Sequence, residues 1–308
     1  MNNSHSEVIT RLTAELTAQN IRFRLVPVSR IEDLSEDIDY TLEQFVDSHD
    51  FAEYARSAYS FNAIKSFPEA KSLLVASVFN PAHKVIFQTQ DRDIEALLPP
   101  GYVNFRSKQA MLQQKIAAIL ASFGFRTERI ILPVKLLAVR SGLAEYGKNN
   151  ISYVEDFGSF HFLGSFLTDL TDNDDFWQEP KVMDACENCN LCQLNCPTGA
   201  VGADRFLLHG EKCITLYNRN PGEFPDWIIR EWHHAMVGCI KCQSVCPQNA
   251  SVFKEIPLLE TFTVSETETL LAATEFETLP QDLKDKFVQF GFPELHHILL
   301  RNIKAVCM

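Results

Sequence analysis

The sequence predicts an α+β fold in three consecutive parts, and three observations lead to this expectation. Helical and strand-like apolar patterns alternate along the first 168 residues, as in an α/β or α+β domain. Eight of the nine cysteines then fall between residues 186 and 246. The final stretch reads mainly as helix. We therefore expect domains at 1–168, 169–255 and 256–308.

Apolar spacing and capping residues place the elements of the first domain. Ser4 and Glu7 form a capping-box pattern ahead of an amphipathic helix. Gly124 and Gly142 follow two further helical patterns as C-terminal stops. The expected order is helix 5–19, strand 21–28, acidic helix 32–59 with Leu42, Phe45 and Phe51 as core contacts, strand 73–79, helix 112–123, strand 129–132, helix 134–141 and strand 160–167.

A polar segment rich in aspartate, before Trp177 and Pro180, is expected to be a solvated linker into the second domain. A calcium site is the alternative, but the glycine and terminal glutamate of an EF-hand loop do not follow. The last predicted element is a helix over residues 293–306.

The cysteines of the second domain follow the spacing of iron–sulfur proteins. Residues 186–197 read C-E-N-C-N-L-C-Q-L-N-C-P, which is the C-x2-C-x2-C-x3-C-P run of bacterial ferredoxins. Residues 239–247, C-I-K-C-Q-S-V-C-P, repeat its second half, with Met236 where a first cysteine would stand. Cys213 is the nearby thiol that completes the set.

The fourth cysteine of each run is expected to ligate the other cluster. Cluster one is then held by Cys186, Cys189, Cys192 and Cys246, and cluster two by Cys196, Cys213, Cys239 and Cys242. Two four-thiolate zinc sites would also use eight cysteines, but zinc-binding sequences have a different spacing. Disulfides are disfavoured because no secretory signal is visible and ligand spacing suits a reducing compartment. Cys307 has no partner and is expected to be a free thiol.

The bulk composition narrows the class of protein. The 308-residue chain carries a formal charge of −12, which disfavours a large electrostatic nucleic-acid surface, although a local basic groove is compatible with it. Neither a signal peptide nor an apolar run of membrane-spanning length appears, so we expect a cytoplasmic protein without a membrane partner.

Two further blocks, joined to the cysteine set, resemble the epoxyqueuosine reductase family. Residues 133–150 read P-V-K-L-L-A-V-R-S-G-L-A-E-Y-G-K-N-N, and residues 157–169 read F-G-S-F-H-F-L-G-S-F-L-T-D. The likeness is clear over 133–250 and weaker at 67–75 and 299–302. It extends to the reductive dehalogenases, which share the corrinoid-binding core.

The resemblance implies an N-terminal corrinoid-binding-type domain followed by a two-[4Fe–4S] ferredoxin-like domain. Cobalamin would bind base-off between them, and the nearer cluster would reduce its cobalt. The family's substrate is epoxyqueuosine in certain tRNAs, and a flavodoxin- or ferredoxin-type protein would donate electrons. The chain departs from the family in three places: near the catalytic aspartate, in the R-Y-x-x-G-x-D-Y-H stretch, and in a C-terminal repeat region cut short at Met308. A small-molecule substrate is therefore kept beside the modified nucleoside and tRNA.

Candidate site residues come from the matched blocks. The family's catalytic aspartate aligns with either Glu128 or Ile130, because this chain is about two residues shorter there. Glu128 is a candidate general acid, or a surface carboxylate paired with a neighbouring arginine. Tyr146 and Lys148 are candidate catalytic residues, with Tyr146 as a proton donor next to the cation Lys148, although Tyr146 could equally anchor a turn. The expected cofactor contacts are Gly142, Gly147, Lys148, Asn149, Gly158 and Ser159, and His161 is expected to be a packing residue.

Two functions follow from these patterns. The first is a cobalamin-dependent iron–sulfur reductase. The second is a non-catalytic two-cluster ferredoxin-type protein that serves a partner protein. The blocks at 142–149 and 158–164 favour the enzyme, because a docking domain has no need to share them with corrinoid proteins.

Overall fold

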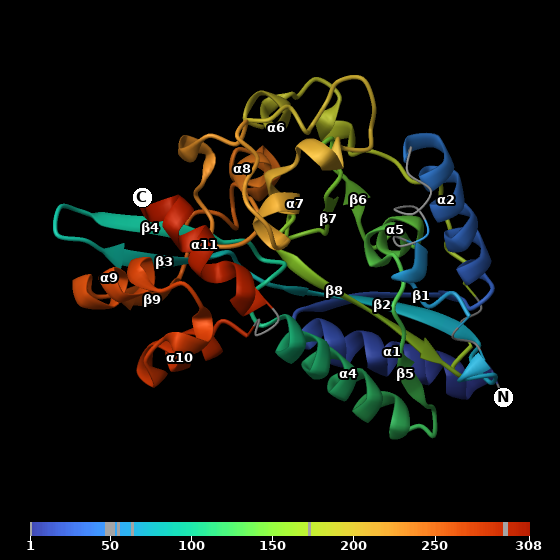
Figure 1. Ribbon diagram of the computed structural model, residues 1–308. Helices are drawn as coiled ribbons and strands as arrows, with labels where there is room; N and C mark the ends of the chain where they lie inside the picture. Colours follow the sequence, from blue (N-terminus) through green and yellow to red (C-terminus); the bar gives the residue numbers. More distant parts are fainter. Residues whose placement is uncertain (1, 47–52, 54–55, 63–64, 172–173, 292–294) are drawn as a thin grey trace.

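The computed structural model describes residues 2–46, 53, 56–62, 65–171, 174–291 and 295–308. Its main sheet has the order β1-β2-β8-β5, and all of its pairs are antiparallel. The strands are β1 (Ile21–Pro27), β2 (Ser72–Phe79), β5 (Thr127–Arg129) and β8 (His161–Thr168). Figure 1 shows this sheet between two layers of helices. An antiparallel sheet with separate helical layers is the α+β arrangement that the sequence predicts.

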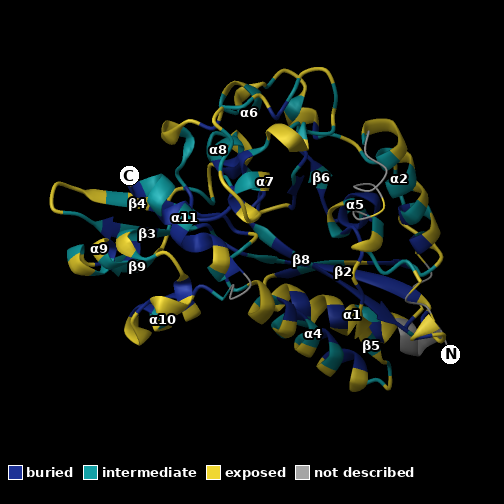
Figure 2. Ribbon diagram, in the orientation of Figure 1, coloured by how far each residue is buried: buried dark blue, intermediate teal, exposed yellow. Residues whose placement is uncertain are grey.

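Alternating residues of β2 reach the two helical layers. Leu74 and Ala76 pack with α1 (Asn2–Ala18) and α4 (Phe105–Ala121), and Leu73 and Val75 pack with α2 (Arg30–Phe45) and α5 (Val134–Arg140). This follows from the pleat of a strand, in which successive side chains point to opposite faces. Both faces are covered, so β2 and β8 are buried over nearly their whole length (Figure 2).

A second sheet joins the early part of the chain to its C-terminal part. The hairpin β3 (His83–Gln88) and β4 (Asp93–Leu98) is completed by β9 (Leu258–Phe262), which runs parallel to β3. The helices α9 (Val264–Ala272), α10 (Gln281–Val288) and α11 (His296–Cys307) cover it around a core rich in phenylalanine. The C-terminal segment is thus helical with one strand, and the sequence pattern missed β3, β4 and β9. The division at residues 168 and 255 stays a prediction.

The cysteine-bearing segment lies over one end of the main sheet. It contains the short helices α6 (Leu191–Leu194), α7 (Ile214–Arg219) and α8 (Lys241–Ser244). Small elements flank it: β6 (Glu145–Tyr146), β7 (Ser152–Tyr153) and the 3-10 turns 184–186, 210–212, 230–232, 247–249 and 276–278. Fully buried Asn302 of α11 donates hydrogen bonds to the carbonyls of Asn218 and Met236, at 2.8 and 2.7 Å. The C-terminal helix therefore holds the cysteine-bearing segment in place through these buried hydrogen bonds.

Some details of the first domain differ from the sequence prediction. The buried residues of α2 are Ile31 and Leu34, whereas Phe45 is exposed and lies under the guanidinium of Arg205. Phe51 lies outside the described residues. The aspartate segment is more than a solvated linker, because Asp175 pairs with Arg30 at 2.5 Å.

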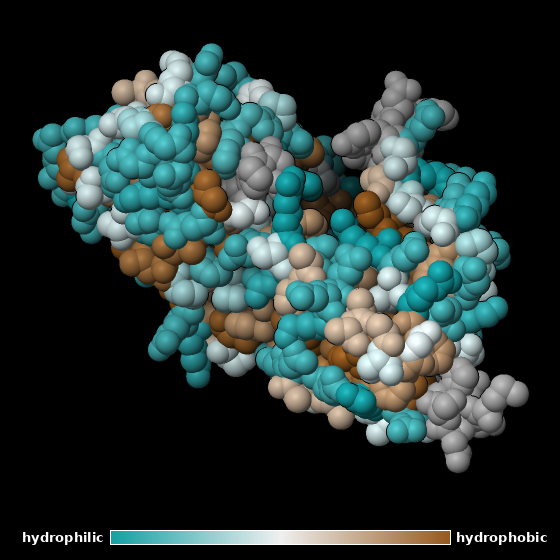
Figure 3. Space-filling model, turned by 90° about the horizontal axis from the view of Figure 1, so that it is seen from below, coloured by the Kyte–Doolittle hydropathy of each residue, from teal (hydrophilic) through white to brown (hydrophobic). Residues whose placement is uncertain are grey.

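The surface is mainly polar. In Figure 3 the hydrophobic residues of the face seen from below form separate patches among hydrophilic ones. Among the described residues, no helix combines the length and apolar character that crossing a membrane requires.

Candidate functional site: a cavity against four cysteines

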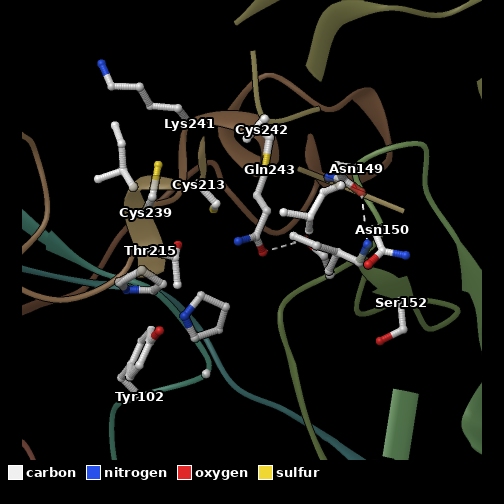
Figure 4. Close-up of a pocket in the computed structure, with 18 of the residues that line it drawn as sticks. Tyr102, Asn149, Asn150, Ser152, Cys213, Thr215, Cys239, Lys241, Cys242 and Gln243 are labelled. Carbon is white, nitrogen blue, oxygen red and sulfur yellow. Dashed lines mark hydrogen bonds between the residues drawn. The ribbon is translucent and has the colours of Figure 1, made fainter. Parts of the chain in front are cut away.

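A cavity of about 580 Å³ lies between the main sheet and the cysteine-bearing segment. This volume is within the range of small-molecule and cofactor sites. Its lining comes from the β4–α4 loop, the start of α5, the 149–152 loop, the start of β8 and the cysteine loops (Figure 4).

One wall of the cavity contains a specific set of thiols. Cys196, Cys213, Cys239 and Cys242 all line it, and they are the four assigned to cluster two from the spacing alone. The cysteines assigned to cluster one do not appear among its described lining residues. A ligand in this cavity would therefore contact the cluster-two side of the segment.

The pKa shifts of the thiols show which of them lie near one another, and Cys242 is affected both by cysteines of its own predicted group and by Cys192 of the other. Burial raises the pKa of Cys192, and Cys186, Cys246 and Cys189 raise it further by charge repulsion. Burial also raises the pKa of Cys239 to about 11, with added repulsion from Cys213 and Cys196. Such repulsion requires proximity, so these thiols lie close together, and the cross-over grouping stays a prediction.

The two cysteine runs have the same local structure. Cys196 N donates to Gln193 O, and Cys246 N donates to Gln243 O, both at 3.2 Å and both just before a proline. Among the described residues, no three His, Cys, Asp or Glu side chains converge as the ligands of one metal ion would. A [4Fe–4S] cube differs, because its four thiolates bind four different iron atoms.

The opposite wall is rich in amides and hydroxyls. Asn149, Asn150, Ser152 and Ser159 are buried there, and Figure 4 shows the first three around the cavity together with Thr215 and Tyr102. Among the described lining residues there is no carboxylate, although the chain carries 40 acidic residues.

His161 also lines this wall, at the first position of β8. Its Nε2 lies 3.0 Å from the carbonyl oxygen of Ser152, to which it can donate, whereas its buried Nδ1 has no partner among the described residues. Burial lowers its pKa to about 4, so the ring is neutral at pH 7. It was expected to be a packing residue and is also part of the cavity.

A buried network joins the two walls. Ser159 Oγ donates to Gln243 Oε1 at 2.9 Å, and Asn249 Nδ2 donates to Ser159 Oγ at 2.9 Å. Gln243 directly follows the ligand candidate Cys242 and itself lines the cavity. Because these polar groups are buried and satisfied by one another, they hold the cysteine loop in register with β8.

The residues predicted for the site fall in different places. Of the expected cofactor contacts, Asn149 and Ser159 line the cavity. Lys148 points elsewhere, because its Nζ donates to the carbonyls of Glu187 at 3.1 Å and Cys189 at 2.9 Å. Lys148 thus stabilises the loop of cluster one.

Tyr146 and Glu128 also lie outside the described cavity lining. Tyr146 is buried against Phe206, with ring centroids 5.1 Å apart, and burial raises its pKa. Glu128 is exposed and pairs with Leu167 across the sheet. Leu167 is four strand residues from Leu163 at the cavity, which is roughly 13 Å at about 3.3 Å per residue. Their predicted catalytic roles remain untested, but the geometry gives them no contact with this cavity.

The three glycines expected to contact the cofactor are explained by packing within the protein. A Cβ on Gly142 would lie 2.3 Å from the ring of Phe176, and one on Gly147 would lie 2.6 Å from that of Tyr153. A Cβ on Gly158, where φ is +56°, would lie 2.3 Å from Asn249 Oδ1. Each glycine allows a neighbouring side chain to approach the backbone closely. The sequence motif alone did not indicate this packing role.

Sequence reasoning missed Lys135 and Tyr102, which both line the cavity. Tyr102 packs over Gly238, and burial raises its pKa to about 12. The signal for Lys135 was a lysine directly after Pro133-Val134, inside a block already matched to the corrinoid family.

Comparison with known proteins supports this description. Residues 185–249 match the family described as "4Fe-4S double cluster binding domain". An epoxyqueuosine reductase from Staphylococcus aureus is 30% identical over 125 residues, which are 41% of this chain and 32% of that protein. The chain is related to the epoxyqueuosine reductases. The matched part spans about a third of the length of that relative.

The fold of the epoxyqueuosine reductases extends over nearly the whole chain. The structure of epoxyqueuosine reductase from Streptococcus thermophilus superposes with a TM-score of 0.70 at 18% identity, covering 96% of this chain and 80% of that one. An epoxyqueuosine reductase solved with an epoxyqueuosine-modified tRNA-Tyr stem loop gives 0.69 at 18% identity, covering 98% and 81%. The shared fold therefore includes the sheet and the cysteine segment.

Proposed function

We propose that the protein is a cobalamin-dependent iron–sulfur reductase of the epoxyqueuosine reductase type. The observation that carries this proposal is the cavity whose wall contains the four thiols of cluster two. A cluster in that wall would deliver electrons directly to whatever the cavity holds. A ferredoxin-type protein that only serves a partner has no need for a ligand-sized cavity at that point.

The cavity lining fits a corrinoid. Side-chain amides and hydroxyls of Asn149, Asn150, Ser152 and Thr215 offer hydrogen bonds to an amide-rich ring, and apolar groups such as Phe105 and Val201 offer it a flat surface. His161 cannot readily become a cobalt ligand through Nε2, since that nitrogen is engaged by Ser152 O. The lining thus suits an amide-rich corrinoid ring, and cobalamin when bound would supply the reducing centre.

Electrons would enter through cluster one, which lies away from the cavity. Next to its ligand Cys192, Leu191 and Leu194 of α6 are 43% and 76% exposed. Exposed apolar side chains beside a redox centre are suited to brief contact with a flavodoxin- or ferredoxin-type donor. In Leu194→Glu we expect slower cluster reduction by such a donor and unchanged reduction by dithionite.

Cobalamin binding is the first test. The reconstituted protein is titrated anaerobically with cob(II)alamin and followed by EPR, with iron and sulfide counted on the same sample. We expect about eight iron atoms per chain, as two cubes require, and a base-off spectrum. The variant Thr215→Trp, which fills the cavity, should retain its iron but not bind cobalamin, whereas Thr269→Trp on α9, a position outside the described cavity lining, should bind normally. Full iron with an unaltered cobalamin spectrum in the wild type would instead support the electron-transfer protein.

The proposed substrate is the epoxide of epoxyqueuosine. The support is the relationship to the epoxyqueuosine reductases and the architecture shared with the tRNA-bound reductase. Reduced holoprotein is mixed with an epoxyqueuosine-containing tRNA stem loop and, separately, with the free nucleoside. Conversion of the stem loop would support a tRNA substrate, and conversion of the nucleoside alone would restrict the substrate to small molecules. Conversion of neither would overturn this part of the proposal.

A further inference from the structure

Lys135 is the cationic residue whose position in the cavity calls for an explanation. It is the second residue of α5, is exposed, and lines the cavity, so its side chain is accessible to a ligand bound there. Its Nζ donates to the carbonyl oxygen of Asn150 at 3.2 Å. Among the described residues, no carboxylate lies within ion-pair distance of it.

Other lysines of this protein do have such partners. Lys84 pairs with Glu95 at 3.0 Å, and Lys286 with Glu266 at 2.9 Å. A lysine on the wall of a cavity without a carboxylate partner loses part of its hydration and gains no ion pair in exchange. Accordingly, desolvation lowers the pKa of Lys135, only partly offset by Cys213. A ligand that displaces water from the cavity would increase that desolvation.

The titratable and charged groups that line the cavity with Lys135 come from several other elements. From β8, His161 is neutral because burial lowers its pKa to about 4. From the β4–α4 loop, Tyr102 stays protonated because burial raises its pKa to about 12. From the start of α7, Cys213 would be a cluster ligand, and Arg219, further along the helix, is permanently charged. Lys241, the first residue of α8, is a second lysine of the described lining. Because desolvation lowers the pKa of Lys135, we take Lys135 as the side chain that exchanges a proton.

We propose that Lys135 donates the proton that the substrate takes up when it is reduced in the cavity. This inference rests on the proposed function. For an epoxide, two electrons from the clusters and two protons convert the three-membered ring to an alkene and water. Lys135 gives one proton from its ammonium group to the oxygen as a carbon–oxygen bond breaks, and becomes a neutral amine. The second proton, and the one that recharges Lys135, come from solvent.

A structural role is the competing explanation. Asn150 has a left-handed backbone, with φ +59°, and the bond from Lys135 could simply hold that turn. Arginine separates the two roles. It can still donate to the Asn150 carbonyl, but its pKa above 12 prevents it from releasing a proton near neutral pH.

The first experiment compares single-turnover substrate reduction by wild type, Lys135→Arg and Lys135→Met as a function of pH. General acids contribute about 10²–10⁴-fold, so both variants should lose about 10²-fold or more. The wild-type rate should fall as Lys135 deprotonates at high pH, and neither variant should show that decrease in rate. Lys254→Met, at an exposed site outside the described cavity lining, is the matched control and should behave as the wild type. A Lys135→Arg enzyme with wild-type rate and pH profile would overturn the proposal.

The second experiment needs no turnover. The midpoint potential of bound cobalamin is measured against pH by spectroelectrochemistry. It should vary with pH in the wild type, because Lys135 changes charge beside it, and be constant in Lys135→Arg. A pH-independent wild-type potential would contradict an exchangeable proton at this site.

Chemical rescue completes the test. In Lys135→Ala, added methylamine should restore part of the rate, with an efficiency that depends on the pKa of the amine used. Equal rescue by amines of every pKa would mean that the added amine only fills the space left by the lysine side chain. Failure of the proposed function would appear earlier and differently, as wild-type protein that binds no cobalamin.

Discussion

Asn149 Nδ2 donates a hydrogen bond of 2.9 Å to the hydroxyl oxygen of Tyr153, and that hydroxyl in turn bonds to the thiol of Cys246. Asn149 also accepts a bond from Ile151 N, which fixes its orientation. The chain of contacts therefore directs the Tyr153 proton onto a predicted ligand of cluster one. Burial and the contact with Cys246 raise the pKa of Tyr153, so it acts as a donor throughout the physiological range.

Removing this donor should lower the reduction potential of cluster one. A hydrogen bond to sulfur stabilises the more negative, reduced cluster. Since a hydrogen bond to a charged group is worth roughly 1.5–3 kcal/mol and about 59 mV corresponds to a tenfold change for one electron, we expect Tyr153→Phe to shift the potential down by at most roughly 65–130 mV. EPR-monitored redox titration measures this. Tyr217→Phe, which loses a bond to the Glu211 carbonyl, is the control. An unchanged potential in Tyr153→Phe would show that the Tyr153 hydroxyl does not influence the cluster through Cys246.

The second prediction separates backbone strain from crowding. Gly158 and Gly199 both have positive φ, +56° and +66°, but only at Gly158 would a Cβ meet other atoms. We expect Gly199→Ala to cost about 1 kcal/mol of unfolding free energy, because alanine is strained at positive φ. Gly158→Ala should cost several times more, since Asn249 and the Gln248 carbonyl must shift. Urea unfolding of the two variants gives the comparison, and equal losses would show that the contact at Gly158 relaxes freely.

The sequence predicted the parts of the fold that have strong local patterns. The apolar run of β2, the helical spacing of Leu112, Ile116 and Leu120, and the cysteine spacings all specify their structure without distant information. The strands β3 and β9 were missed because Val85 and Phe262 become core residues only when segments about 175 residues apart pair.

The candidate site shows the same limit. Cluster ligands could be grouped from spacing, because ligand geometry constrains nearby residues in the chain. Lys135, Tyr102 and His161 come from three separate elements, and only packing brings them to one cavity. Motif matching assigned Lys148 and Tyr146 to the chemistry, whereas their contacts are with a loop carbonyl and a phenylalanine ring.

His161 gives a prediction for the pH dependence of stability. Its pKa is about 4 in the folded protein and roughly 6.5 when unfolded. Between these two pH values the unfolded chain thus binds more protons than the folded protein does. The stabilisation that comes from burying a neutral His161 is therefore complete above about pH 6.5 and is lost as the pH falls toward 4. Its size is roughly 3 kcal/mol at most. The unfolding midpoint of His161→Gln should therefore fall less than that of the wild type between pH 7 and pH 5. Parallel curves would mean that His161 is hydrated in the fold.

The final prediction tests the ligand assignment at the cavity. Cys213 is separated from both cysteine runs in sequence, but it lines the cavity with Cys196, Cys239 and Cys242. Cys213→Ser should lower the iron content from about eight toward four atoms per chain and leave the cluster held by Cys186, Cys189 and Cys192 intact. Cys307→Ser is the control, because that thiol is buried in the C-terminal core and should leave iron unchanged. Full iron with an unchanged EPR spectrum in Cys213→Ser would exclude it as a ligand, and the cavity would then have to be assigned a different electron source.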